Sequence, residues 1–110
     1  MDRELKRGTL DLVLLQLLSE SDRYGYEITS ELAGRSAQAF EIKEGTLYPV
    51  LYRLESAGFI EPYWQMQERG VPRKYYRITE PGQVELERQR SEWVKFVAVI
   101  DSLLGTGARS

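Results

Sequence analysis

Residues 44–60 read EGTLYPVLYRLESAGFI, and this stretch decides the fold. Its apolar residues recur at the three- and four-residue spacing that places side chains on one side of a helix. They are Leu47, Val50, Leu51 and Leu54. Gly58 follows where a helix is expected to end, because glycine adopts the left-handed conformation at little cost. The stretch predicts a short helix whose polar, aromatic face is suited to a recognition helix, with nucleic acid as the first partner to consider.

The composition excludes several classes of protein. A chain of 110 residues fits one small domain with a modest core, which dimerisation would extend. It contains neither cysteine nor histidine, which excludes a disulfide framework and a zinc–thiolate site and removes the commonest general base. It also lacks a glycine-rich phosphate loop and a cluster of metal ligands. We therefore expect a protein that is not an enzyme and needs no cofactor or metal.

The chain also lacks the sequence features of a membrane protein. Its first residues are charged, and no apolar segment approaches the length of a membrane span. We expect a cytoplasmic protein with no membrane partner.

Charge is distributed unevenly along the chain. The net charge is −2, which by itself disfavours nucleic acid as a partner. Residues 43–77, however, hold six basic and four acidic side chains, whereas residues 1–42 balance to −3 and residues 78–110 to −1. Phosphate contacts act within about a Debye length, roughly 8–10 Å in physiological salt, so the local excess of positive charge matters more than the total.

Two helices are predicted before this stretch. The first covers about residues 9–19 and is apolar nearly all round, which indicates a second packing partner besides its own domain. The second covers about residues 24–34, with Gly34 as its expected C-terminal cap. Gly25 disfavours a helix by up to about 1 kcal/mol, so it indicates a close backbone approach to another helix or to a ligand. Residues 40–42 alternate apolar and polar and predict a short strand.

A hairpin and a long helix are predicted after it. Residues 59–66 and 74–79 are rich in aromatic and branched side chains, and Gly and Pro lie between them, so the two runs predict a β-hairpin. Pro62 belongs on an edge strand or at a bulge of this hairpin. Thr79 is a natural N-cap for a helix that runs to about Leu104.

The order of these elements predicts the fold class. Three helices around one core, followed by a two-stranded wing, make a winged helix-turn-helix, which is mainly α with a small β part (α+β). We assign residues 1–79 to a winged helix-turn-helix DNA-binding domain, residues 80–104 to a C-terminal dimerisation helix and residues 105–110 to a flexible tail.

Short motifs follow one another along nearly the whole chain. They are Gly8-Thr9-Leu10, Tyr24-Gly25-Tyr26-Glu27-Ile28, Gly45-Thr46-Leu47-Tyr48-Pro49, Arg53-Leu54-Glu55, Gly58-Phe59-Ile60, Arg73-Lys74-Tyr75-Tyr76-Arg77-Ile78-Thr79 and Gly82. In this order and spacing they resemble the PadR family of transcriptional regulators, and a single C-terminal helix resembles its short subfamily. The resemblance implies homodimers that bind palindromic operators in double-stranded DNA, usually as repressors. In some members it implies an aromatic or drug-like effector near the dimer interface that relieves binding.

Eight residues are candidates for contact with DNA. They are Tyr24, Lys43, Thr46, Tyr48, Arg53, Arg69, Arg73 and Lys74. Tyr48 lies opposite the leucine stripe and either contacts a base edge or phosphate, or packs as a surface tyrosine on Tyr52 or the wing. Thr46 either donates to a phosphate at the helix N-terminus or caps the helix.

The other candidates have two readings as well. The cations at the hairpin turn reach the DNA backbone or minor groove, or only keep the turn soluble. Lys43 and Arg53 contact phosphate or bases, although Arg53 is also explained as a solvated charge near Glu55. The resemblance places Tyr24 near phosphate, with a tyrosine at the rim of the core as the alternative.

The last helix supplies candidates for dimerisation and ligand binding. The predicted interface residues are Leu10, Leu14, Trp93, Val97, Ile100 and Leu104, of which the last four follow a heptad-like spacing. In a two-fold dimer Trp93 either meets its mate, leaving a slot for a planar aromatic ligand, or simply packs in the interface. Trp64 is interpreted as core or wing packing.

Together these features predict a sequence-specific DNA-binding transcriptional regulator. It would be a homodimeric repressor on a palindromic operator, released by an aromatic or drug-like effector. The alternative is a winged-helix dimer that acts as a ligand-binding or protein-interaction module without DNA binding.

Overall fold

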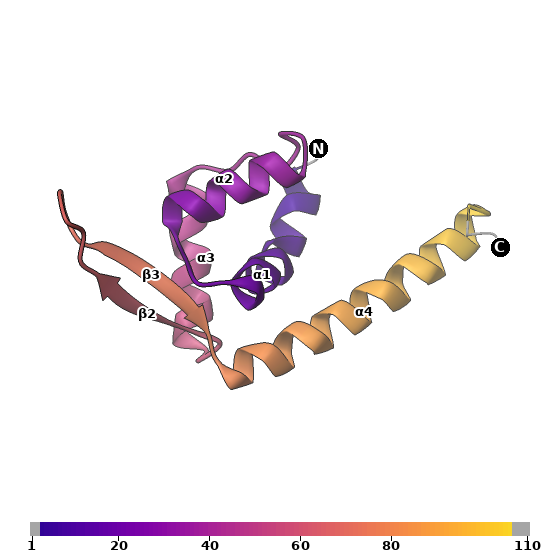
Figure 1. Cartoon of the computed structure of the whole chain (residues 1–110). Coiled ribbons are helices and arrows are strands. Elements are labelled where there is room, and N and C mark those ends of the chain that lie inside the picture. Colours follow the sequence, from indigo (N-terminus) through magenta and orange to yellow (C-terminus); the bar gives the residue numbers. More distant parts are fainter. Residues whose placement is uncertain (1–2, 107–110) are drawn as a thin grey trace.

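The structure, a computed structural model, describes residues 3–106, with side chains from Thr9 onward. Its elements, in chain order, are α1 (Arg3–Glu20), β1 (Arg23–Tyr24), α2 (Gly25–Arg35), α3 (Glu44–Ser56), β2 (Ile60–Gln65), β3 (Arg73–Ile78) and α4 (Glu80–Leu104). Helices α1, α2 and α3 pack around one another, the β2–β3 wing projects to one side, and α4 leaves on the other (Figure 1). Most of the predicted tail lies outside the described residues.

The core forms where the apolar stripes of the three helices meet. Its largest fully buried side chains are Leu10, Leu14, Leu15, Leu17, Leu18, Ile28, Leu47, Leu51, Leu54, Ile60 and Leu86. The leucine stripe of α3 is therefore buried as the sequence predicts. Leu86 closes the core from the first half of α4, which packs against α1.

Helix α1 lies at the centre of the fold, and this position corrects one prediction. It contacts α2, α3 and β3 within residues 1–79 and also α4 beyond them, so α4 is a packing partner outside its own domain. Leu10 and Leu14 are 1% and 0% exposed within the single chain, so they have no surface left for a partner. The prediction that these two leucines lie in a dimer interface is wrong.

The sheet has three strands in the order β1-β3-β2, all antiparallel. Strand β1 is only two residues long and includes Tyr24, so the prediction that Tyr24 begins a helix is wrong. Pro62 lies on β2, which pairs with β3 alone, so its predicted place on an edge strand is confirmed.

The connection between α2 and α3 differs from the prediction. Residues 40–42 form no strand, because Phe40 is buried beside a turn whose main chain is held by Ser36. The Ser36 hydroxyl donates to the Leu32 carbonyl (2.6 Å) and accepts from the Phe40 N–H (2.8 Å). Ser36 is also the C-cap residue of α2, so the prediction that Gly34 caps this helix is wrong.

A charged cluster joins the ends of α1 and α2. Two guanidinium nitrogens of Arg35 donate to the Glu20 carboxylate, and Arg35 Nε donates to Glu31 (2.7 Å). The hydrogen bonds from Arg35 lower the pKa of Glu20 to about 2. The carboxylate thus stays charged and links the end of α1 to the end of α2.

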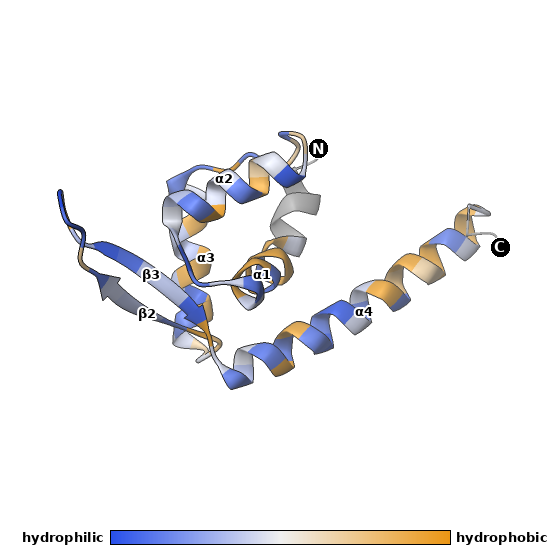
Figure 2. Ribbon diagram, viewed as in Figure 1, coloured by the Kyte–Doolittle hydropathy of each residue, from blue (hydrophilic) through white to orange (hydrophobic). Residues whose placement is uncertain are grey.

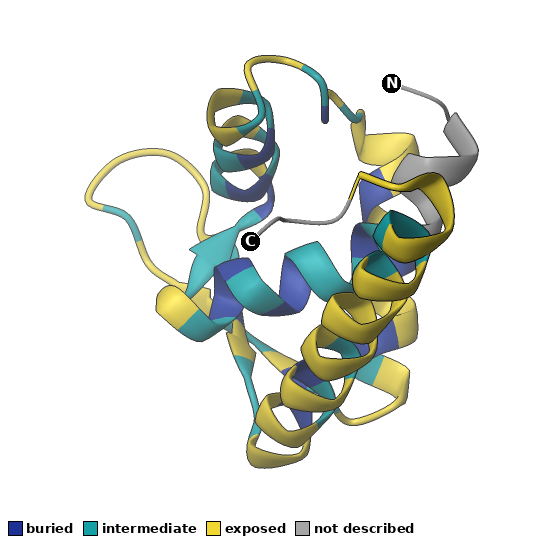
Figure 3. Ribbon diagram, turned by 90° about the vertical axis from the view of Figure 1, so that its right-hand side faces the viewer, coloured by how far each residue is buried: buried dark blue, intermediate teal, exposed yellow. Residues whose placement is uncertain are grey.

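Helix α4 begins on the body of the molecule and ends away from it. Thr79 caps its first turn as predicted, because the Thr79 hydroxyl accepts from the Gly82 N–H (3.1 Å). The second half of α4 carries apolar side chains and is exposed almost throughout (Figures 2 and 3). Among the described residues no helix is long and apolar enough to cross a membrane.

Candidate nucleic-acid interface

The outward face of α3 is the centre of the candidate site. Lys43 is the N-cap residue and is exposed, and Thr46 is exposed in the first turn of the helix. The main chain starts the helix here, since the Lys43 carbonyl accepts from the N–H groups of Thr46 and Leu47 (both 3.0 Å). An ammonium group cannot cap a helix N-terminus, but it can hold a phosphate there.

Tyr48 lies between α3 and the start of α2. A Cβ atom on Gly25 would lie 2.3 Å from the Tyr48 hydroxyl oxygen, so a larger residue at this position would displace the Tyr48 side chain. The close approach predicted at Gly25 is therefore confirmed, and the approaching element is α3. Tyr48 remains 42% exposed, which leaves part of its ring to a ligand.

The wing adds positive charge beside α3. Arg69 and Arg73 are exposed, and Lys74 is half-buried with its ammonium 5.7 Å from the Tyr76 ring centre. Arg73 lies over the ring of Tyr24, with its guanidinium carbon 4.6 Å from the ring centre. Tyr24 therefore joins the start of α2 to the wing, and its half-buried position fits either reading of this residue.

Arg53 lies on α3 about two turns after Thr46, on the same side of the helix. Its guanidinium donates to Asp11 of α1 (2.5 Å) and lines a groove toward α4, while its side chain remains exposed. The ion pair shows one partner of Arg53, and contact with DNA stays a prediction.

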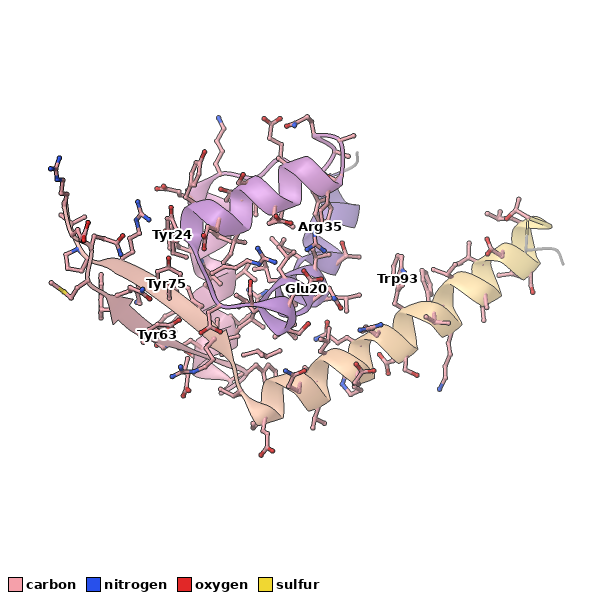
Figure 4. All side chains as sticks on the ribbon, viewed as in Figure 1. Glu20, Tyr24, Arg35, Tyr63, Tyr75 and Trp93 are labelled. Carbon is pink, nitrogen blue, oxygen red and sulfur yellow. The ribbon has the colours of Figure 1, made fainter. Side chains whose placement is uncertain are left out.

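The same groove contains Trp93. It has a volume of about 500 Å³ and lies between α1, the second half of α3 and α4. Trp93 and Phe96 form one wall, with ring centres 6.2 Å apart, and Asp11, Arg53 and Arg88 are among its charged lining. Figure 4 shows Trp93 on the side of α4 that faces the body of the molecule.

Two exposed aromatic residues enlarge the candidate site. Tyr52 is 72% exposed, on the side of α3 away from the buried leucine stripe. Its spacing from those leucines in the sequence already indicated that it faces outward. Trp64 is 65% exposed, so its interpretation as a core residue is wrong; it lies on the wing, where it pairs with Lys74 across the two strands. Within residues 3–106 no group of three or more histidine, cysteine or acidic side chains is placed to hold a metal ion.

Comparison with known proteins identifies the family. The model of the PadR-like family of transcriptional regulators matches residues 14–88. An uncharacterized protein from Lysinibacillus sphaericus is 45% identical over 98 residues, which cover 89% of this chain and 90% of that protein. A transcriptional regulator from Clostridium thermocellum has a similar structure, with a TM-score of 0.85 and 35% identity over 93% of this chain and 96% of that chain.

A third relative has been solved with its DNA. PadR from Bacillus subtilis, in complex with operator DNA, matches with a TM-score of 0.67 and 31% identity over 74% of this chain and 46% of that chain. These similarities confirm the winged helix-turn-helix fold and the expectation of a regulator rather than an enzyme. The chain belongs to the PadR-like family of transcriptional regulators.

Proposed function

We propose that this chain is a DNA-binding transcriptional repressor that acts as a homodimer on a palindromic operator. The observation that carries the proposal is the exposed face of α3, with Lys43 at its start and the cationic wing beside it. A helix of this kind enters the major groove, while a wing contacts the flanking backbone. The operator complex of the B. subtilis relative supports the same use of the fold here.

Dimerisation supplies the second copy of the reading helix. The exposed apolar residues of α4 include Val94, Phe96, Val99, Leu103 and Leu104, a surface that a soluble protein normally covers. An apolar pocket of about 370 Å³ between α1 and α2 is lined by Leu12, Val13, Leu17, Leu32 and Phe40 and offers a place for apolar side chains of a partner. A two-fold axis would place the two α3 helices about one helical turn of DNA apart, roughly 34 Å.

A salt series on operator DNA tests the proposal. We expect Arg69→Ala and Lys43→Ala each to weaken binding to all DNA sequences. For each variant the slope of log affinity against log salt should fall by about 1.8 per dimer, because each lost phosphate contact contributes about 0.9. The measurement is fluorescence anisotropy of labelled DNA from upstream of the protein's own gene.

Lys95→Ala is the matched control, since Lys95 is an exposed cation on α4 far along the chain from the site. Its salt slope should equal that of the wild type. If the wild type binds neither operator nor random DNA even in low salt, the chain is a ligand-binding or protein-interaction module instead.

We further propose that a planar aromatic effector binds at Trp93 and releases the operator. The aromatic wall of the groove supports stacking, and Arg53 on its floor belongs to the reading helix, so an occupant would act on α3. A Trp64→Phe variant isolates the fluorescence of Trp93. Titration with proflavine, a planar cation, and with 2-naphthoate, a planar anion, should quench this fluorescence for at least one of them. No quenching by either probe would leave Trp93 as interface packing.

A further inference from the structure

Three tyrosines form a row across the three-stranded sheet. Tyr24 of β1 pairs with Tyr75 of β3, and Tyr75 pairs with Tyr63 of β2, so the three are direct cross-strand neighbours. The ring centres of Tyr24 and Tyr75 lie 5.3 Å apart, and those of Tyr75 and Tyr63 lie 5.7 Å apart. Figure 4 shows the three side chains in sequence from the start of α2 to the wing.

An arginine lies against each end of this row. Arg73 lies over Tyr24 at 4.6 Å, and Arg77 lies over Tyr63 at 4.8 Å. Both come from β3 and lie two residues before and two residues after Tyr75. Since side chains two residues apart point to the same face of a strand, both arginines share the face of Tyr75. Tyr76 points to the opposite face and is buried in the core. The row is therefore on the outer face of the sheet and takes no part in the core.

The row is anchored at its far end to the body of the molecule. The Tyr63 hydroxyl donates to the Asp22 carboxylate (2.7 Å), which precedes β1, so β2 is tied to the opposite edge of the sheet across β3. This hydrogen bond raises the pKa of the Tyr63 hydroxyl, which therefore remains a donor. Arg77 is held in turn by Glu61 of β2 (3.0 Å).

The main chain alone gives the wing little support. Strand β1 contributes two residues of pairing, and β2 is an open edge. A two-stranded hairpin is marginally stable by itself. Aromatic cross-strand pairs and cation–π contacts each add a modest interaction at exposed sites, so a row of four such contacts can together fix the tilt of the wing.

We infer that Tyr75 and Tyr63 are positioning residues for DNA binding, which hold the wing and the Arg73 guanidinium against Tyr24 at the start of α2. Neither tyrosine is required to contact DNA. The inference rests on the proposed function, because it concerns how one cation of the candidate interface is aimed. Its distinctive consequence is that loss of Tyr75 and loss of Arg73 remove the same contribution to DNA affinity.

A double-mutant cycle on DNA binding tests this coupling. Tyr75→Thr keeps a strand-forming residue but removes the ring. We expect Tyr75→Thr to weaken binding to operator and random DNA equally, about tenfold, and to lower the salt slope by about 1.8 per dimer, as Arg73→Ala does. The double variant should bind no more weakly than Arg73→Ala alone. Additive losses in the double variant would overturn the inference.

Tyr75→Phe is the matched control, since it keeps the ring and removes only the hydroxyl. It should bind DNA like the wild type; a loss equal to that of Tyr75→Thr would show that the hydroxyl itself contacts DNA and would overturn the inference. Tyr63→Phe breaks only the tie to Asp22 and serves as a second variant if Tyr75→Thr fails to fold. It should lower the salt slope in the same direction as Tyr75→Thr, but by a smaller amount.

A measurement without DNA separates this inference from the proposed function. Trp64 lies on the wing and reports its motion in a Trp93→Phe background. Time-resolved anisotropy of Trp64 should show a larger fast component in Tyr75→Thr and Tyr63→Phe than in the parent protein. An unchanged fast component in both variants would overturn the inference even if the protein binds DNA, and absent DNA binding by the wild type would overturn only the proposed function.

Discussion

Gly82→Ala is expected to lower the free energy of unfolding by about 2–4 kcal/mol, although it adds a single methyl group. A Cβ atom at this position would lie 2.0 Å from the Phe59 carbonyl oxygen and 2.7 Å from a side-chain carbon of Ile78. The carbonyl belongs to the main chain between α3 and β2 and also accepts from the Thr79 N–H (3.0 Å). It cannot move aside without loss of the contacts by which α4 is joined to the body. Urea unfolding at a fixed protomer concentration measures the effect, which corresponds to a fall in Tm on the order of 10–20 °C.

Gly34→Ala is the control for this substitution. Gly34 also lies in a helix, but a Cβ atom there would meet nothing within 4 Å. The higher helix propensity of alanine should then stabilise the protein by about 0.5–1 kcal/mol. If Gly82→Ala behaved like Gly34→Ala, the start of α4 would not be packed on the α3–β2 turn as tightly as the distances indicate.

Local rules in the sequence were sufficient for most of the fold. The leucine stripe of α3, the helix end at Gly58 and the cap at Thr79 are each decided within a few residues, and the structure confirms all three. Gly25 was also informative, because glycine disfavours a helix and its presence near a helix start indicates that another group approaches the main chain closely. The structure supplies the explanation in the side chain of Tyr48.

What the sequence could not reveal depends on contacts between distant residues. Periodicity shows that Leu10 and Leu14 are buried, but not whether their own chain or a partner buries them. The ion pair between Arg53 and Asp11 joins residues 42 positions apart. The tyrosine row requires the pairing register of three strands, one of which has only two residues and no recognisable pattern.

Replacing Phe96 and Leu103 together by aspartate is expected to convert the protein to monomers and to reduce operator affinity by about 10²–10⁴-fold. Both side chains are more than half exposed in the single chain, so the fold of each protomer should survive. In a two-fold interface every substitution occurs twice, so four carboxylates would have to be buried without partners. The loss of affinity follows because two linked reading helices bind far more tightly than one. Sedimentation equilibrium and DNA anisotropy measure the two effects.

The control places two charges on another side of the same helix. Ser91 and Ser102 are exposed on α4 and lie about a third of a turn around the helix from Phe96 and Leu103, so Ser91→Asp with Ser102→Asp should remain dimeric and bind the operator. Circular dichroism verifies that both proteins are folded. A Phe96→Asp and Leu103→Asp protein that stays dimeric would place the interface elsewhere, and α1 would be the next surface to test, because its Leu12 and Val13 line the apolar pocket. A monomer that kept full operator affinity would mean that one α3 helix and one wing suffice, and the operator would then need no palindrome.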